Sequence, residues 1–419
     1  MRQDAVKKAR RRLSREKGTI YKDWGGRVPI ALIYPNSYYL GMSNLGFQTI
    51  YSLLNSCEGI VCERFFCEKD EVPLSLESQR PLSDFDVLAF SVSYELDYFN
   101  IAKLLRAGSI PLLAAERGER YPLIMAGGPC ITANPEPLSP IFDCFAIGEG
   151  EVILPYFVDT LAEGVGKKQG LLKELCSLPG VYVPGISDTK VARQWAKNID
   201  DFATTSVVLT PDTELGGMYL MEVARGCRWG CRFCLAGYQF RPMRHRSLEC
   251  ILEQAREGIK YRKRLGLVGA SVSDHPQIDE LVIGLREMGV ELSVSSLRVR
   301  PLSRTVLRGL AGSGTKTVSL APEAGSERLR RVIKKGFAEE DILKAVEKVA
   351  REGLRQLKLY FMIGLPTETD DDVMEIVKLT LACKEILNRH KADTRITLTI
   401  GPFVSKAGTP FQWLPMERA

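Results

Sequence analysis

Three cysteines lie close together in the second half of the chain, at Cys227, Cys231 and Cys234. Their spacing, C-x3-C-x2-C with a glycine inside it, places three thiols on one short loop directly after an expected strand. Three thiolates on such a loop can bind three irons of a [4Fe-4S] cluster and leave the fourth iron without a protein ligand. The alternative is a zinc site with His245 as fourth ligand, but closed zinc sites usually pair two cysteines with a second, distant pair. The spacing therefore favours an iron–sulfur cluster.

The cysteine loop resembles that of radical S-adenosylmethionine (SAM) enzymes. The likeness rests on the triplet, on its position after the first strand of a strand-helix series, and on the aromatic Phe233 before the third cysteine. In that family SAM chelates the open iron, and a reduced cluster cleaves it to methionine and a 5′-deoxyadenosyl radical that abstracts hydrogen from the substrate. The resemblance implies a [4Fe-4S] cluster, SAM, and an external one-electron donor of the flavodoxin or ferredoxin type.

Further segments at expected strand ends match the family in their order along the chain. Taken singly, each is typical of a plain loop or a helix cap. Because strand ends in a parallel barrel meet on one face, their order supports a shared site. The second-strand segment differs in its letters from the Gly-Gly-Glu-like turn of the family. The SAM-binding residues that the resemblance implies are Phe233, Gly269, Ser273, Ser296, Glu323, Ile363 and Gly364. No catalytic side chain is assigned.

Six strand patterns alternate with helical patterns around these segments. Six β/α steps in about 200 residues predict a partial parallel (β/α)6 barrel, open where a full eightfold barrel closes. The expected strands are 218–223, 267–272, 291–297, 316–321, 356–363 and 395–400, and the expected helices are 247–264, 276–288, 303–311, 326–351 and 370–388.

The first half of the chain carries a separate series of short strands and helices. Between residues 27 and 165 this alternation predicts a doubly wound, Rossmann-like parallel sheet, so the fold class is α/β throughout. Such sheets bind ligands beyond the carboxyl ends of their strands. The loops expected there, at 35–41, 91–94, 127–129 and 148–150, are rich in turn residues.

This N-terminal series resembles the cobalamin-binding-type domain that precedes many radical SAM cores. The likeness runs through 30–35, 41–46, 127–129 and 148–151, and is closest to a subgroup without an assigned substrate that also has the 94–96 and 409–413 segments. The Asp-x-His-x-x-Gly cobalamin motif is absent, and no histidine precedes His245. Two alternatives stay open: cobalamin is bound without a histidine from this domain, or the domain keeps the shape and has lost the ligand.

These patterns divide the chain into a basic N-terminal arm (1–27), a cobalamin-binding-type domain (28–165), a connector (166–215) and a radical SAM core (216–419). Residues 1–17 hold eight basic and two acidic side chains, the whole net charge of +6. The arm is expected either to bind nucleic acid or an acidic partner, or to be a solvated, frayed helix. Arg241, Arg244 and Arg246, just past the cysteine loop, are expected to favour an anionic substrate or redox partner.

The composition sets further bounds. With 45% hydrophobic and 26% charged residues, the chain is globular, and its odd count of eleven cysteines argues against a disulfide framework. Only three histidines are present, which disfavours histidine-rich metal sites and Ser-His-Asp hydrolysis. No run approaches the ~18 apolar residues of a membrane-spanning helix and no secretory signal is visible, so a cytoplasmic location without membrane contact is expected.

Cysteines outside the cysteine loop are expected to pack in the hydrophobic core. Cys57, Cys62 and Cys67 recur at five-residue intervals, which suggests a second cluster like that of methylthiotransferases, but buried cysteines commonly act as small hydrophobes. Core packing is the favoured interpretation there, and also for four further cysteines, Cys130, Cys144, Cys250 and Cys383.

Three hypotheses follow for the function, and the substrate is not assigned. The leading one is cobalamin-associated methyl or group transfer, such as methylation of an unactivated carbon. The second is radical modification of RNA or protein. A different class is a non-catalytic iron–sulfur or zinc module. The chain stops soon after the sixth expected strand whereas the resembled subgroup continues, which allows a truncated or split product.

Overall fold

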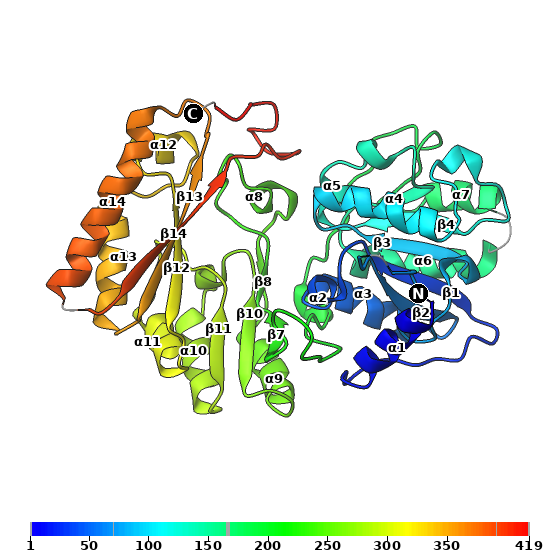
Figure 1. Cartoon of the computed structure of the whole chain (residues 1–419), viewed down its shortest axis with the longest axis horizontal. Helices are drawn as coiled ribbons and strands as arrows, with labels where there is room; N and C mark the ends of the chain where they lie inside the picture. Colours follow the sequence, from blue (N-terminus) through cyan, green and yellow to red (C-terminus); the bar gives the residue numbers. More distant parts are fainter. Residues whose placement is uncertain (1, 70, 165–167, 391, 418–419) are drawn as a thin grey trace. The chain divides into compact units, whose positions relative to one another are not determined.

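The computed structural model describes residues 2–69, 71–164, 168–390 and 392–417, which form two compact units (Figure 1). The first unit holds the residues up to Lys197 together with Phe202–Gly217, and the second holds Asn198–Asp201 with Met218 and all later residues. Most of the expected connector thus belongs to the first unit. No helix among the described residues combines the length and the apolar composition that crossing a bilayer requires.

A six-stranded sheet forms the centre of the first unit within the described residues. Its order is β2-β1-β3-β4-β5-β6, parallel except for β6, which pairs antiparallel with β5. The order reverses direction at β1 and β3, so the sheet has the switch point of a doubly wound fold. The strands are β1 Val28–Tyr34, β2 Ile60–Phe66, β3 Val87–Ser91, β4 Leu123–Gly127, β5 Cys144–Ala146 and β6 Val181–Tyr182.

Successive residues of β1 enter two separate hydrophobic cores. Ile30 and Leu32 pack in one core, whereas Ala31 and Ile33 pack in the other, because side chains alternate along a strand. The first core takes side chains from α1, α3, α6 and α7, the second from α4 and α5. Helices therefore cover both faces, which confirms the predicted doubly wound sheet. The helices are α1 Arg2–Leu13, α2 Tyr38–Gly41, α3 Leu45–Ser56, α4 Tyr98–Ala107, α5 Pro129–Ala133, α6 Gly150–Gly164 and α7 Lys168–Cys176.

The first part of the N-terminal arm forms helix α1, which packs within the first unit. Ala5 and Ala9 are buried on one side of α1, and Ala9 belongs to the first core. Lys8 pairs with Glu68 at 3.3 Å and Arg12 with the same carboxylate at 2.6 Å. The expectation of a frayed, solvated helix is therefore wrong, because a small-residue face and intramolecular ion pairs dock α1.

The second unit is an open barrel. Its strands form two parallel triplets, β11-β10-β7 and β12-β13-β14, which a parallel bridge from Leu297 to Leu320 connects. This arrangement confirms the predicted partial (β/α)6 barrel. Its strands are β7 Met218–Glu222, β10 Arg264–Val268, β11 Glu291–Val294, β12 Thr317–Glu323, β13 Gln356–Ile363 and β14 Arg395–Pro402, and a short antiparallel ribbon joins β8 Ala224–Arg225 to β9 Arg244–His245.

Helices follow the barrel strands in turn, and polar caps begin several of them. Ser247, Ser303, Ser326 and Thr369 each accept a hydrogen bond from a first-turn backbone N–H, as N-cap residues do. The helices are α8 Ala236–Gln239, α9 Leu248–Gly258, α10 Ile278–Glu287, α11 Arg304–Gly312, α12 Glu327–Val332, α13 Glu339–Arg351 and α14 Asp370–Arg389.

Several expected elements of the barrel differ from the structure in their bounds. The helix expected at 326–351 is split into α12 and α13, because the intervening loop contains Gly336 in a left-handed conformation (φ +75°). The second barrel strand begins at Arg264 rather than at 267, because α9 ends early at Gly258. The basic run at 262–264 therefore leads into a strand instead of ending a helix.

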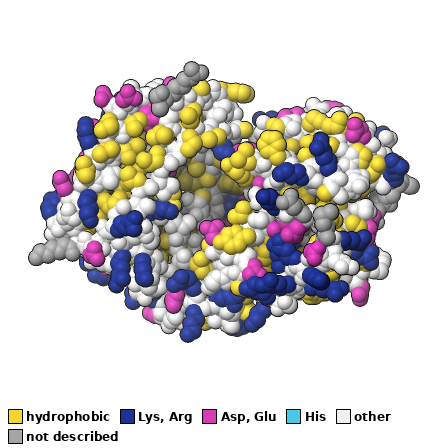
Figure 2. Space-filling view, in the orientation of Figure 1, with side chains coloured by type: hydrophobic (Ala, Val, Ile, Leu, Met, Phe, Trp, Pro, Cys, Tyr) yellow, Lys and Arg dark blue, Asp and Glu magenta, His cyan; other side chains and the backbone are white. Residues whose placement is uncertain are grey.

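The outer surface of the barrel carries an apolar area over α14 and β14 (Figure 2). Met374, Val377 and Leu381 project from α14 at helical spacing, and Leu398 and Ile400 from β14; all five are exposed. In the described part of the chain β14 pairs only with β13, so this area marks the open edge of the barrel.

Candidate active site

The cysteine loop begins at a glycine that its conformation requires. Gly226 has φ +87°, and a Cβ at this position would lie 2.1 Å from the carbonyl oxygen of Phe240. The ribbon of β8 and β9, which pairs Ala224 with His245, holds both ends of this segment together. The loop thus leaves the carboxyl end of β7 in a fixed direction, toward the other strand ends of the barrel.

The three thiols differ in burial. Cys227 and Cys231 are buried, with 8% and 6% of their surface exposed, and Cys234 is partly buried. Burial raises the pKa of the Cys227 thiol, and the Asp274 carboxylate raises it further. Burial also raises the pKa of Cys231, which the nearby Lys335 ammonium opposes. A metal that binds these sulfurs must displace their protons.

The donor set fits a cluster with three protein ligands. Among the described residues no three His, Cys, Asp or Glu side chains are gathered as ligands of one metal ion. A cubane does not need such a group, because each cysteine binds a different iron. Three thiols on one loop would therefore hold three irons of a [4Fe-4S] cluster.

A buried carboxylate ties the cysteine loop to the end of β10. Asp274 closes the short 3-10 turn η6 (Val272–Asp274), and its Oδ2 accepts hydrogen bonds from the indole Nε1 of Trp229 and, at 2.8 Å, from Ser271 Oγ. Trp229 lies between the first two cysteines. Arg298, which follows β11, places its guanidinium 4.0 Å from the centre of the Trp229 ring. Side chains from three strand ends thus meet at this loop.

The end of β12 approaches the loop from another side. Phe233 packs against an apolar cluster that includes Ala324 and Leu365, and the Lys335 ammonium lies 5.9 Å from its ring centre. Lys335 also donates to Glu323 Oε1 at 2.9 Å. Glu323 itself has φ +69°, after a break in register between β12 and β13. Such bulges are frequent beside active sites, where they re-aim a side chain.

The other expected SAM-binding residues lie at strand ends in three settings. Gly269 directly follows β10, where a Cβ would lie 3.0 Å from the Ala224 carbonyl oxygen. Ser273 is buried, and its Oγ accepts from the Arg298 backbone N–H at 3.5 Å. Ser296 is exposed. These positions share the carboxyl edge of the barrel.

The end of β13 forms a tight turn. Ile363 is partly buried, and Gly364 follows it with φ +76°. The Gly364 backbone N–H donates to Glu368 Oε2, which also accepts from Leu365 N at 3.3 Å. Burial raises the pKa of Glu368, an effect that these backbone hydrogen bonds oppose. In this structure the backbone N–H of Gly364 is therefore already hydrogen-bonded to the Glu368 carboxylate.

The expected basic field beside the loop needs correction. Arg246 is 1% exposed and donates to the backbone oxygen of Glu222 at 2.9 Å, and Arg244 is also buried. Both arginines lie in β9, which pairs with β8, or directly after it, and their side chains are buried. Arg241 alone of the three is exposed.

Two of the chain's histidines also pack together beneath the loop. The rings of His245 and His275 meet edge-to-face with centres 5.3 Å apart. His275 Nδ1 accepts from Gln277 N at 3.2 Å, which leaves Nε2 as the donor to the Arg246 carbonyl oxygen at 2.8 Å. Burial lowers the pKa of His245, and the neighbouring His275 lowers it further.

The cysteines outside the loop behave as packing residues or lie partly exposed. Four are fully buried: Cys62, Cys130, Cys144 and Cys383. Four are partly buried: Cys57, Cys67, Cys176 and Cys250. Burial raises the pKa of Cys383 to about 12, as expected of a thiol in an apolar core.

The first unit presents a second set of strand ends, at its switch point. After β1, Asn36 donates to Asp97 Oδ1 at 2.6 Å, and Asn44 donates to Ser93 Oγ at 3.2 Å after β3. Large apolar side chains are exposed in the segments that follow these two strands, including α2 and the start of α4: Tyr39, Leu40, Tyr94, Leu96 and Phe99. An exposed apolar rim of this kind is typical of a ligand or partner surface.

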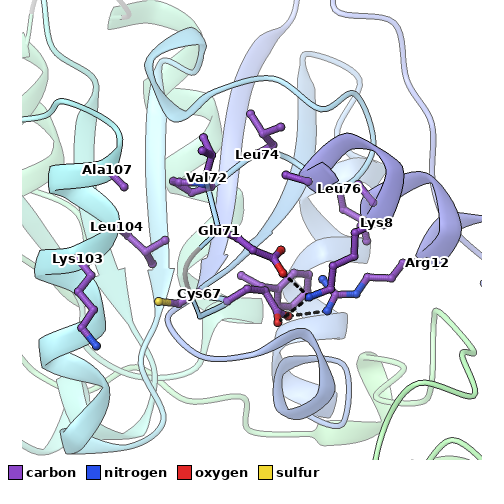
Figure 3. A pocket seen from close by; sticks show the side chains of 15 residues that line it. Lys8, Arg12, Cys67, Glu71, Val72, Leu74, Leu76, Lys103, Leu104 and Ala107 are labelled. Carbon is purple, nitrogen blue, oxygen red and sulfur yellow. Dashed lines mark hydrogen bonds and ion pairs between the residues drawn. The ribbon is translucent and has the colours of Figure 1, made fainter. Parts of the chain in front are cut away.

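A small cavity of about 170 Å³ lies beside the end of β2 (Figure 3). Lys8 and Arg12 of α1 reach across it to the carboxylates of Glu71 and Glu68, while Cys67 and Lys103 lie on the opposite side. The ion pairs neutralise most of its polar lining. It lies in the first unit beside the loop after β1, because the backbone N–H of Cys67 donates to the Asn36 carbonyl oxygen at 2.9 Å.

Four residues of the barrel site are not among those expected from the sequence: Trp229, Asp274, Arg298 and Lys335. Each owes its place to a contact between distant segments, such as the 45 residues that separate Trp229 from Asp274. For three of them a signal was available, namely an indole between two cysteines and charged residues just after two expected strands, whereas Lys335 lies inside an expected helix.

Family models match both halves of the chain. One, described as radical SAM proteins, N-terminal, matches residues 46–184, and another, the radical SAM superfamily, matches residues 221–380. The uncharacterized protein MJ0966 of Methanocaldococcus jannaschii is 33% identical over 390 residues, 91% of this chain and 79% of that protein. The chain belongs to the radical SAM superfamily. Radical SAM proteins are enzymes that use an external electron donor, so the hypothesis of a non-catalytic module is wrong.

Solved structures of radical SAM enzymes share the fold. OxsB, a cobalamin-dependent enzyme solved with aqua-cobalamin and SAM, has a TM-score of 0.67 at 16% identity, covering 92% of this chain and 60% of that one. The methyltransferase TsrM from Kitasatospora setae has a TM-score of 0.60 at 14% identity, covering 92% and 75%. The methyltransferase PH0819 of Pyrococcus horikoshii is 26% identical over 271 residues, 61% of this chain and 57% of that protein. This radical SAM chain thus spans little more than half of some relatives.

Proposed function

We propose that Cys227, Cys231 and Cys234 hold the [4Fe-4S] cluster of this radical SAM enzyme. The observation that carries the proposal is their position: a loop with two buried thiols leaves the first strand of an open parallel barrel. Three thiols leave one iron of a cubane open for a small ligand, which is the coordination that SAM requires. A bound, reduced cluster would supply the electron that cleaves SAM.

We propose that the barrel strand ends position SAM against this loop. Phe233 supplies an apolar surface, and Gly269 permits close backbone approach after β10. Ser273, Ser296 and Glu323 supply polar groups from the ends of β10, β11 and β12, respectively. Ile363 and Gly364 form the side of the site beside β13. Collected on one edge, these residues would orient the ligand and exclude water.

Anaerobic reconstitution tests the cluster assignment. We expect about four irons per chain, as a [4Fe-4S] cluster requires, and an electron paramagnetic resonance (EPR) signal after dithionite reduction. Replacing any one of the three cysteines by alanine should abolish the signal, whereas Cys250→Ala, on α9, should retain it. Stoichiometric zinc without iron after anaerobic purification would contradict the assignment.

We further propose that the first unit binds cobalamin and that the enzyme transfers a methyl or related group. The exposed apolar rim beside β1 and β3 suits the broad face of a corrin, and the rim lies at the switch point where doubly wound sheets bind ligands. The fold shared with OxsB and TsrM supports this ligand. Because no histidine precedes His245, cobalt would be bound without a histidine from this unit.

Titration with hydroxocobalamin, followed by absorbance, tests this proposal. We expect saturable binding that Phe99→Ala weakens at least tenfold, because Phe99 is 71% exposed on the rim. Tyr156→Ala removes a similarly exposed aromatic side chain from α6 and should leave the affinity unchanged. A cobalamin site on this rim would be excluded if the two variants bind hydroxocobalamin with equal affinity, or if the parent chain does not bind it.

A further inference from the structure

The structure shows how the loop between the first two cysteines is held. Trp229 donates its indole N–H to Asp274 and contacts the guanidinium groups of Arg298, at 4.0 Å from the ring centre, and Arg228, at 4.9 Å. The ring is therefore fixed at its edge by a hydrogen bond and flanked by cations. Since Trp229 is two residues from Cys227 and Cys231, fixing it fixes the backbone between both thiols.

The Asp274 carboxylate is buried, and hydrogen bonds and nearby cations balance only part of its negative charge. Its side chain is 1% exposed; Oδ2 accepts the bonds from Trp229 and Ser271, while Oδ1 is buried without a hydrogen-bond partner among the described residues. The guanidinium of Arg228, 4.0 Å from Oδ2, belongs to a side chain that is 59% exposed. A pair so exposed is largely screened by solvent, so much of the carboxylate charge acts on its buried surroundings.

We infer that Asp274 is a positioning residue for the cluster: through Trp229 it fixes the cysteine loop, and its buried negative charge lowers the reduction potential of the cluster. The inference rests on the proposed cluster ligands. Adding one electron makes a cluster more negative, and a nearby anion in a poorly solvated setting disfavours that step. Asp274 would thus act in two ways, by holding the cysteine loop through the hydrogen bond from Trp229 and by placing a negative charge near the cluster.

Two variants separate these influences. Asp274→Asn removes the charge and keeps a side-chain oxygen for Trp229, whereas Trp229→Phe removes the N–H donor and keeps the charge and an aromatic ring. Glu280→Gln is the matched control, because Glu280 is an exposed carboxylate six residues further along the chain, in the first turn of α10. Trp229 is only partly buried, so its variant keeps the inference testable if Asp274→Asn does not fold.

The experiment uses the full chain, reconstituted anaerobically, with dithionite redox titration followed by EPR and with the rate of iron loss to a chelator. We expect the midpoint potential of Asp274→Asn to shift to a more positive value at an unchanged rate of iron loss. Trp229→Phe should lose iron several-fold faster, and Glu280→Gln should match the parent in both. The inference would be overturned if the parent chain holds four irons and every variant has the same midpoint potential and the same rate of iron loss as the parent. A parent chain without the cluster would instead refute the proposed function.

Discussion

Gly226 shows how one residue determines the direction of the cysteine loop. Its φ of +87° lies in the left-handed region, and the space where a Cβ would stand is occupied by the Phe240 carbonyl oxygen. An L side chain here meets both a strained backbone and a backbone clash, neither of which a side-chain rotation can relieve.

Gly226→Ala is expected to reduce reconstituted iron by more than half while the protein still folds, because the strain is confined to the loop. Iron and sulfide analysis with a circular dichroism spectrum measures both. Gly217→Ala is the control, since a Cβ there meets nothing within 4 Å. Full iron content in Gly226→Ala would show that the loop tolerates another path.

Arg64 is a buried charge whose partners are also buried. Its Nη2 contacts Glu16 at 2.7 Å and its Nε contacts Glu77 at 2.6 Å, and the Arg64 side chain is 0% exposed. Arg64→Met would leave two carboxylates buried without their cation, so the free energy of unfolding should fall by about 3–5 kcal/mol. Denaturant titration measures it.

The matched variant is Arg15→Met, which breaks an exposed pair with Asp212 and should cost less than about 1 kcal/mol. Equal losses in the two variants would mean that burial does not decide the strength of these pairs.

At the residue scale, the sequence predicted which residues lie close together when they are neighbours along the chain. The cysteines and Phe233 share one loop, so their proximity follows from the chain itself. Asp274 lies just after the second expected barrel strand, but its bond to Trp229 depends on how β7 and β10 pair. The burial of Arg246 was missed for the same reason: its partner Glu222 lies on a different strand.

At the element scale, the start of α14 shows how a cap links two helices. Thr369 and Asp372 form a capping box, and the Asp372 carboxylate also accepts from Ser326 and Arg328 at the start of α12. Burial alone would raise the pKa of Asp372, but these hydrogen bonds lower it to about 2. Because this pKa is below its ordinary value, the stabilisation is complete above pH ~4 and is lost as the pH falls toward 2.

Asp372→Asn should therefore lower the free energy of unfolding at pH 7 by about 2 kcal/mol, and the difference from the parent should shrink as the pH falls from 4 to 2. Denaturant titrations across this pH range measure it. Asp370→Asn, an exposed acid in the same turn, controls for the helix dipole and should cost less than about 1 kcal/mol. A difference that stays constant with pH would contradict the assignment.

Element type was more predictable than element boundaries. The pattern of alternating apolar residues predicted β13 at Gln356–Ile363, as observed. Every second residue of this strand, Leu357, Leu359 and Phe361, is apolar and buried on one face of the sheet. The break between α12 and α13 was missed, since helical periodicity continues on both sides of Gly336. The docking of α1 was missed because alanine gives a weak apolar signal in a strongly basic helix.

At the scale of the whole molecule, two α/β units each gather functional groups at the carboxyl ends of parallel strands. The barrel gathers thiols and polar groups, and the doubly wound sheet gathers amides, hydroxyls and an apolar rim. Both architectures followed from the spacing of strand and helix patterns, because parallel strands need a covering helix between them. The substrate could not be predicted from these patterns, since its contacts depend on loops, which have no regular pattern of apolar residues.

The most direct test of the central claim is the release of 5′-deoxyadenosine from SAM by anaerobically reconstituted, dithionite-reduced protein. Cys231→Ala removes one proposed cluster ligand, and Cys250→Ala makes the same substitution on α9, outside the loop. We expect release by the parent chain and by Cys250→Ala, and none by Cys231→Ala. A parent chain that holds four irons but releases no more 5′-deoxyadenosine than Cys231→Ala would contradict the account.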